Sequence, residues 1–154
     1  MYPLIIYFYK VDAPYGCFSN FSPHSIELGG KSWATVEHYY QAHKFEGTEF
    51  EYLMAEIQAA STPELAAKIG RTPAHQPRAD WDLHKCEIMY RAISQKFSSH
   101  LDVQQTLLDT LDAEIVEDSP VDHFWGCGID RSGQNQLGRI LMQVRSELIY
   151  FARS

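Results

Sequence analysis

Residues 35–46 of this chain read TVEHYYQAHKFE. Thr35 is a residue type that favours helix N-caps, so a helix is expected over residues 36–46. Glu37 falls in its first turn, where the helix dipole favours a carboxylate, and this structural role alone would explain it. Lys44 follows seven residues later, two turns along the same face. A carboxylate and an ammonium on one face could address different ends of one ligand.

Two β segments are predicted before this helix. Residues 4–9 (LIIYFY) are apolar and rich in β-forming types, which predicts a buried central strand. Residues 26–28 and 31–33 flank Gly29-Gly30. A Gly-Gly pair supplies the positive φ angles of a tight turn, so these residues predict a hairpin.

Helical patterns dominate the rest of the chain. Thr48 and Glu51 have the spacing of a capping box that would open a second helix. Pro63 is expected to start a third helix and Gly70 to stop it. Asp80 is expected to cap a fourth.

The C-terminal third continues this alternation. A helix is expected after Ser99, with Leu111 on its buried face, then a strand over residues 113–117 and a last helix from Gln136. Residues 118–135 form a long loop, and loops of this length in a compact domain are usually functional. The fold class predicted is α+β: a mainly helical single domain over residues 1–154 with a small β-sheet.

The composition is that of an ordinary globular protein, with 45% hydrophobic and 21% charged residues. The net charge of −7 and the lack of a basic stripe argue against general nucleic-acid binding, although a few local cations suffice for one phosphate. Cys17, Cys86 and Cys127 lie far apart in sequence, which predicts reduced thiols in the cytoplasm. No signal peptide or membrane span is expected, because the apolar run at residues 4–9 is too short. The oligomeric state is left open.

Three further segments carry unusual polar and aromatic residues. The first contains Phe18, Ser19 and Asn20, which read either as a tight turn with an aromatic plug or as a floor and hydrogen-bonding groups for a flat ring. In the second, Trp81 lies between Arg78 and Lys85. These three read either as a capped helix with exposed basic residues or as a stacking plate beside phosphate-binding cations.

The third segment is the long loop. Asp122 lies there beside aromatic residues that include Trp125, and Gly126 would let the backbone approach a ligand closely. The alternative is an exposed aspartate in a glycine turn. Asn135 ends this segment. A metal site is not predicted, because Glu37 precedes His38 and the zincin spacing is absent.

These segments, in this order, resemble the NADAR family. The matching strings are YGCFSNF at 15–21, EHYYQAHKF at 37–45, KIGR at 68–71, WDLHK at 81–85, KF at 96–97, DHFWGCG at 122–128 and NQLGRILM at 135–142. The resemblance extends from about Ile6 to Leu148. Cys17 and Cys127 depart from the family pattern, where polar residues are common, so the edges of the pocket are less well defined.

The resemblance implies an N-glycosidase that acts on ribosylated bases. It points first to the early phosphorylated ribosylaminopyrimidine intermediates of riboflavin biosynthesis. The alternatives are removal of ADP-ribose from guanine in nucleic acid, or a non-catalytic sensor that binds ADP-ribose or NAD. Carried over by motif, Glu37, Trp81 and Asp122 are similar to the family's catalytic set.

The chemistry of this reaction fits two carboxylates. Cleavage of a C1′–N bond develops positive charge on the sugar, and such reactions usually use two carboxyl groups with different duties. Glu37 and Asp122 are the predicted pair, and their separate duties are left open. Trp81 would stack on the base, and Lys44, Arg78 and Lys85 would bind phosphate. The predicted partner is thus a small phosphorylated ribosyl-base, and no cofactor is required.

Overall fold

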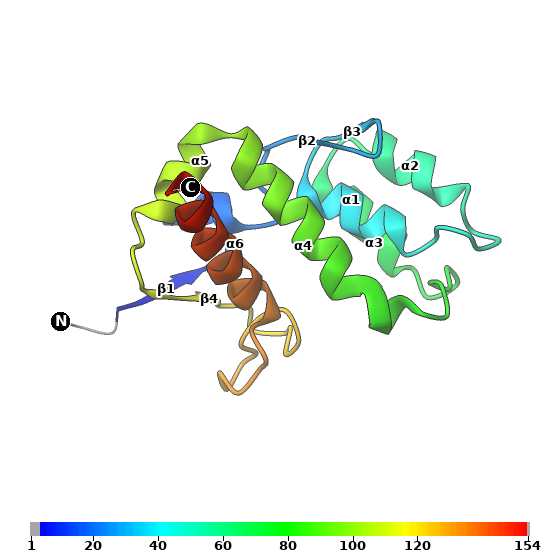
Figure 1. Ribbon diagram of the computed structural model, residues 1–154. Coiled ribbons are helices and arrows are strands. Elements are labelled where there is room, and N and C mark those ends of the chain that lie inside the picture. Colours follow the sequence, from blue (N-terminus) through cyan, green and yellow to red (C-terminus); the bar gives the residue numbers. More distant parts are fainter. Residues whose placement is uncertain (1–3, 154) are drawn as a thin grey trace. The chain divides into compact units, whose positions relative to one another are not determined.

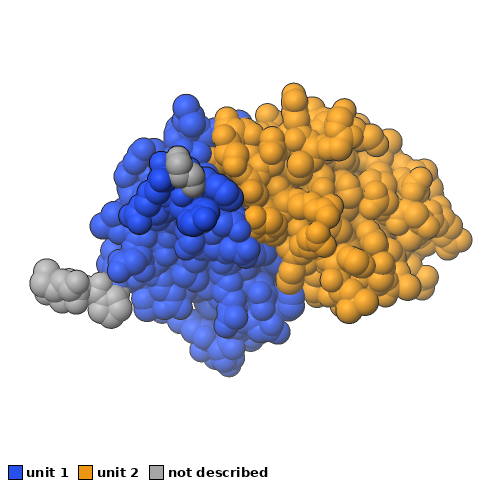
Figure 2. Space-filling model, viewed as in Figure 1, with its two compact units in different colours: residues 1–22, 100–154 blue, residues 23–99 orange. Residues whose placement is uncertain are grey.

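The computed structural model describes residues 4–153 and divides the chain into two compact units. One unit combines the N-terminal segment to Ser22 with the C-terminal segment from His100, and the other runs from Pro23 to Ser99 (Figure 2). The mainly helical α+β class is confirmed. The prediction that residues 1–154 form one domain remains a prediction.

The first unit is built on a two-stranded parallel sheet. Strand β1 (Ile5–Phe8) pairs with β4 (Glu114–Glu117) in the register Ile5 to Glu114. Helix α6 (Gln136–Ala152) packs on β4 and on α5 (Leu101–Leu108) (Figure 1). A short 3-10 helix, η1, spans Gly16–Phe18. The largest fully buried side chains of this unit are Phe8, Phe18, Leu107 and Ile115.

Two predictions for this unit are corrected. The strand at residues 4–9 is half-buried, because Ile6 and Phe8 face the core while Ile5 and Tyr7 are 40% and 36% exposed. A two-stranded sheet covered on one face needs apolar residues at alternate positions only. Leu111 is 73% exposed and lies beyond the end of α5, in a turn with a φ of 57°.

The second unit contains the predicted hairpin and four helices. Strands β2 (Ile26–Leu28) and β3 (Lys31–Trp33) pair antiparallel through Gly29 and Gly30, whose φ angles are 62° and 76°. Helix α1 (Val36–His43) packs against three neighbours: α2 (Leu53–Ala59), α3 (Pro63–Arg71) and α4 (Trp81–Ser99) (Figure 1). Helix α1 is therefore the central element of this unit.

Helix boundaries in this unit differ from those predicted. Helix α1 ends at His43 rather than Glu46. The capping box at Thr48 is wrong: α2 begins only at Leu53, and Glu51 accepts a hydrogen bond from the backbone N–H of Gly47 (2.6 Å). Local turns over residues 44–52 satisfy these polar groups before a helix can start.

Helix α3 is capped by Thr62, whose hydroxyl accepts a hydrogen bond from the backbone N–H of Leu65 (3.1 Å). Gly70 does not stop it, because the helix continues to Arg71 and Gly70 is buried inside its last turn.

Candidate active site

Glu37 is a buried carboxylate at the start of α1, with only 4% of its surface exposed. The predicted cap is confirmed, since the Thr35 hydroxyl accepts a hydrogen bond from the backbone N–H of His38 at 3.2 Å. The cap fixes where the helix begins and so which residues face inward. Burial goes beyond what a helix-dipole partner needs, because such a residue works equally well in solvent.

Two side chains contact the Glu37 carboxylate. Gln41 donates a hydrogen bond from Nε2 to Glu37 Oε2 at 2.7 Å, and Arg71 Nη2 lies 3.7 Å from the same oxygen. Burial raises the pKa of the Glu37 carboxyl above its ordinary value, while the Gln41 hydrogen bond and the charges of Arg71 and Lys44 lower it. The carboxylate is thus desolvated and also stabilised by one hydrogen bond and by nearby positive charges, a combination frequent at functional sites.

Lys44 lies close enough to Glu37 for each charge to affect the pKa of the other. Its Nζ donates a hydrogen bond to the carbonyl oxygen of Gly70 at 3.4 Å and lies 5.8 Å from the ring centroid of Tyr40. Burial lowers the pKa of Lys44 to about 8, Glu37 raises it, and the positive charges of Arg71 and Lys85 lower it further. The predicted carboxylate and ammonium therefore do share one region.

Trp81 is the first residue of α4 and is 7% exposed. Its ring centroid lies 5.1 Å from that of Tyr40, with the planes inclined at 56°. Tyr40 therefore contacts both Trp81 and the Lys44 ammonium. This places Trp81 beside the Glu37 helix, while its burial also gives it a role in packing.

Trp81→Ala is expected to lower the free energy of unfolding by about 3 kcal/mol, the low end of the range for removing a buried Trp. Trp81→Phe keeps an aromatic ring against Tyr40 and should retain most of that stability. Urea denaturation of the three proteins measures both effects. If the alanine variant has the same free energy of unfolding as the parent, Trp81 does not stabilise the core, and only a ligand-stacking role is left for it.

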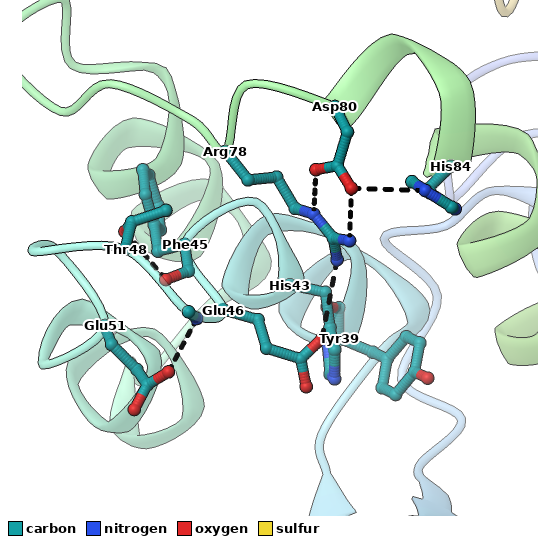
Figure 3. Close-up of polar contacts among 10 residues, drawn as sticks. Tyr39, His43, Phe45, Glu46, Thr48, Glu51, Arg78, Asp80 and His84 are labelled. Atoms are coloured by element: carbon teal, nitrogen blue, oxygen red, sulfur yellow. Dashed lines mark hydrogen bonds and ion pairs between the residues drawn. The ribbon is translucent and has the colours of Figure 1, made fainter.

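The other two predicted cations have carboxylate partners. Lys85 Nζ lies 3.0 Å from Asp82 Oδ1 of the same helix; the Asp82 side chain is 89% exposed and that of Lys85 19%. Arg78 donates from Nε and Nη2 to the two carboxylate oxygens of Asp80 at 2.6 and 2.9 Å, and from Nη1 to Glu46 at 3.4 Å (Figure 3). The hydrogen bond from Arg78 lowers the pKa of Asp80 to about 2. These contacts account for Arg78 without a phosphate.

The segment at residues 16–20 forms a turn in the first unit. Phe18 is 1% exposed, stacks on Tyr15 and meets Phe8 edge to face, with centroids 5.5 and 5.8 Å away. The aromatic-plug interpretation therefore describes Phe18. Ser19 Oγ accepts a hydrogen bond from the backbone N–H of Phe21 at 3.1 Å, and Asn20 follows it at a partly exposed position.

Asp122 organises the long loop of the same unit. Its Oδ1 accepts hydrogen bonds from the backbone N–H groups of Phe124 and Trp125 at 2.9 and 2.8 Å. Its own N–H donates to Ser119 Oγ at 3.1 Å. One carboxylate oxygen thus holds the turn while the side chain stays partly exposed.

The remaining loop candidates also have contacts within the loop and with β4. A Cβ at Gly126 would lie 2.9 Å from the carbonyl oxygen of Glu117, so this glycine permits a close approach to protein backbone, and its approach to a ligand remains a prediction. Asn135 donates to the carbonyl oxygen of Ile115 at 2.9 Å and accepts from the backbone N–H of Glu117 at 3.0 Å, which ties the loop to β4. Trp125 packs edge to face on Phe124, centroids 4.8 Å apart.

The structure thus places the predicted residues in two sets. Glu37, Lys44, Trp81, Arg78 and Lys85 belong to the unit from Pro23 to Ser99, and the others belong to the unit that contains Asp122. Sequence reasoning missed Gln41 and Arg71. The i, i+4 spacing from Glu37 could have indicated Gln41, whereas Arg71 comes from another helix, and its only signal was its place in the string KIGR.

Residues 4–153 carry neither a metal-type cluster nor a membrane-spanning helix. No three or more His, Cys, Asp or Glu side chains within this range form a group suited to a metal ion. No helix among these residues combines the length and apolar character that crossing a membrane requires.

Comparison with known proteins places this arrangement in a family. The model of the NADAR domain matches residues 7–149. This chain belongs to the NADAR family. An N-glycosidase of Nostoc punctiforme is 54% identical over 94% of this NADAR chain and 93% of its own length. A chloroplastic riboflavin biosynthesis protein of Zea mays is 47% identical over 94% of this chain but only 25% of its own length. The solved structure of the Escherichia coli protein YbiA has a TM-score of 0.90 and 38% identity, and the match covers 100% of this chain and 90% of YbiA.

Proposed function

We propose that this protein is an N-glycosidase that hydrolyses the C1′–N bond between a ribose and a nitrogen base. The observation that carries the proposal is the buried Glu37 carboxylate, one oxygen of which accepts a hydrogen bond from Gln41 and forms an ion pair with Arg71. Relatives named N-glycosidase support the reaction class, because they match nearly the whole chain and most of their own lengths.

Glu37 is suited to the role of general base. A base works best when its pKa approaches the working pH, and burial moves the pKa of Glu37 upward in that direction. In the proposed step the C1′–N bond breaks, its electron pair stays on the base nitrogen, and a water oxygen bonds to C1′. Glu37 takes a proton from that water, and this proton then passes to the nitrogen of the departing base. Asp122 is proposed as the second carboxylate, which positions the ribose hydroxyls.

The proposed substrate is a phosphorylated ribosylaminopyrimidine, an early intermediate of riboflavin biosynthesis. The name of the maize relative supports this pathway. Lys44 and Lys85 stay in the proposed phosphate site, and Arg71 takes the place of Arg78, because the charges of Arg71 and Lys85 both act on Lys44. Three cations in a chain of net charge −7 form a local site that an anion would favour.

The cytoplasm is the proposed location. Cys17, Cys86 and Cys127 form no disulfide among the described residues, which is the expected state of thiols in a reducing compartment.

A substrate panel tests the proposal. The purified protein is incubated with the ribosylaminopyrimidine phosphates, NAD, ADP-ribose and ADP-ribosylated DNA, and the released base and sugar are measured. Release from the pyrimidine nucleotides alone is expected. Release of ADP-ribose from DNA would show that the substrate is ADP-ribosylated DNA and not a pyrimidine nucleotide. Binding of NAD or ADP-ribose without any release would show that the protein is a sensor and not an enzyme.

The pH dependence of the reaction should report on Lys44. Its pKa is lowered to about 8, so its positive charge is lost as the pH rises through this value. Above that pH, kcat/KM for the phosphorylated substrate should fall by up to about tenfold per pH unit, since kcat/KM follows the ionisation of the free enzyme. The same measurement on the dephosphorylated nucleoside should show no such fall.

Lys44→Arg supplies the control for this profile, because a guanidinium keeps its charge throughout the range. The alkaline fall should disappear in this variant for the phosphorylated substrate. A fall of equal size with the nucleoside, or one that persists in Lys44→Arg, would remove Lys44 from the phosphate site.

A further inference from the structure

Gln41 occupies an unusual position next to Glu37. It lies one turn later on α1, is 1% exposed, and donates a hydrogen bond from Nε2 to Glu37 Oε2 at 2.7 Å. A buried glutamine normally satisfies both ends of its amide. Here only the nitrogen end does so, because Gln41 Oε1 is buried without a hydrogen-bond partner in the part of the chain that the structure describes.

The unpartnered oxygen lies against Gly70 of α3. A Cβ at position 70 would lie 2.1 Å from Gln41 Oε1 and 2.9 Å from Gln41 Cβ, so no larger residue fits unless the glutamine moves. Gly70 is inside the last turn of α3, where glycine weakens a helix relative to alanine. The glycine is therefore needed because Gln41 occupies this space, and the buried amide oxygen of Gln41 costs stability because it has no partner among the described residues.

We propose that Gln41 is a positioning residue for Glu37 and that Gly70 provides the space that it needs. The amide nitrogen fixes the orientation of the carboxylate by holding Oε2, and Gly70 keeps the amide in place from the opposite side. This inference rests on the proposed function, in which Glu37 is the general base, and it adds a residue that would not itself touch the substrate.

The hydrogen bond from Gln41 bears on the ionisation of Glu37. The groups that act on its carboxyl are Lys44 and His38 from α1 and Arg71 from α3, together with the neutral amide of Gln41. The three charged or titratable groups stay in place when only Gln41 changes. A hydrogen bond to an ionised group stabilises that form, so loss of the amide should raise the pKa of Glu37 further.

Gln41→Met removes the donor while it keeps the length of the side chain. The pKa of Glu37 is measured directly from the chemical shift of its carboxyl carbon during an NMR titration, assigned by comparison with Glu37→Gln. We expect this pKa to rise by about one unit. The acid limb of the pH profile of kcat/KM, where the rate falls as Glu37 becomes protonated, should move to higher pH by the same amount. At a pH on this shifted acid limb, kcat/KM of Gln41→Met should be about tenfold below that of the parent protein, and raising the pH should restore it.

Gln58→Met is the matched control. Gln58, like Gln41, lies on a helix and donates a hydrogen bond from Nε2. Its helix is α2, and its acceptor is the carbonyl oxygen of Ser32 at 2.9 Å. The control should leave both the Glu37 pKa and the acid limb unchanged. A Gln41→Met protein with an unmoved Glu37 pKa, or with a rate reduced equally at every pH, would overturn the inference.

A double-mutant cycle tests the part played by Gly70. Gly70→Ala should shift the acid limb as Gln41→Met does, since the added methyl group displaces the glutamine. In a Gln41→Ala background the amide is already absent, so Gly70→Ala should shift the acid limb no further, although its methyl group would still meet the Cβ of residue 41 at 2.9 Å. Independent effects of the two substitutions would refute the pairing. This cycle also stands if Gln41→Met does not fold, because it does not use that variant.

Different results would contradict the role of Gln41 and the role of Glu37. If Glu37→Gln keeps the rate of the parent, Glu37 is not the general base and the proposed function fails. If Glu37→Gln is inactive but the Glu37 pKa is the same in the parent and in Gln41→Met, only the role of Gln41 is lost. A rise of the Glu37 pKa in Gln41→Met and in Gly70→Ala, without one in Gln58→Met, supports the inference.

Discussion

Glu37→Gln is expected to lower kcat by about 10²–10⁴-fold, the range for removing a positioned general acid or base. The substitution keeps the shape of the side chain and replaces its charge by a neutral amide. The fold should persist, because Glu37 is buried and its charged form is disfavoured by desolvation. Steady-state kinetics on the pyrimidine nucleotide and thermal unfolding of the same sample provide the two measurements.

Glu64→Gln is the matched control for this substitution. Glu64 lies in the first turn of α3, as Glu37 does in α1, but it is exposed. Both variants lose a favourable interaction with a helix dipole, worth about 0.3–1 kcal/mol. Only Glu37→Gln should lose turnover. If kcat is the same in the two variants, Glu37 is only a partner of the helix dipole and not the general base.

Asp122→Asn is expected to lower kcat/KM by about 10²-fold, because it removes a carboxylate that we propose to position the ribose. Asparagine retains an Oδ1 that can accept the hydrogen bonds from the N–H groups of Phe124 and Trp125. The turn should therefore survive, and the loss should come from the charge. Kinetics with the pyrimidine nucleotide and an NMR spectrum of the loop amides test the two parts.

Asp130→Asn serves as the control in the same loop. Asp130 Oδ1 also accepts hydrogen bonds within its own turn, from the backbone N–H of Ser132 at 3.1 Å and from the Ser132 hydroxyl at 2.7 Å. Its replacement should leave kcat/KM unchanged. If Asp130→Asn is the slow variant and Asp122→Asn is not, the second carboxylate is Asp130.

Elements with strong local signals were predicted correctly. Gly29 and Gly30 have the positive φ angles that a Gly-Gly hairpin requires, and Thr35 caps α1. The capping box at Thr48 failed because its hydroxyl donates back to the carbonyl oxygen of Phe45 at 2.8 Å, inside a run of turns. Gly70 was predicted to end α3, but it lies inside the helix, where its missing side chain leaves room for Gln41, a residue remote in sequence.

The sequence by itself determined the family, the helix that carries Glu37 and the loop that carries Asp122, because these depend on ordered motifs and local caps. The tertiary structure alone decided that Glu37 is buried, that Arg71 lies 3.7 Å from it, and that Arg78 is bound to Asp80 and Glu46. The physical reason is that desolvation and Coulomb interactions depend on distances in space. The approach of Arg71 on α3 to Glu37 on α1 results from helix packing, which the spacing of residues within either helix does not specify.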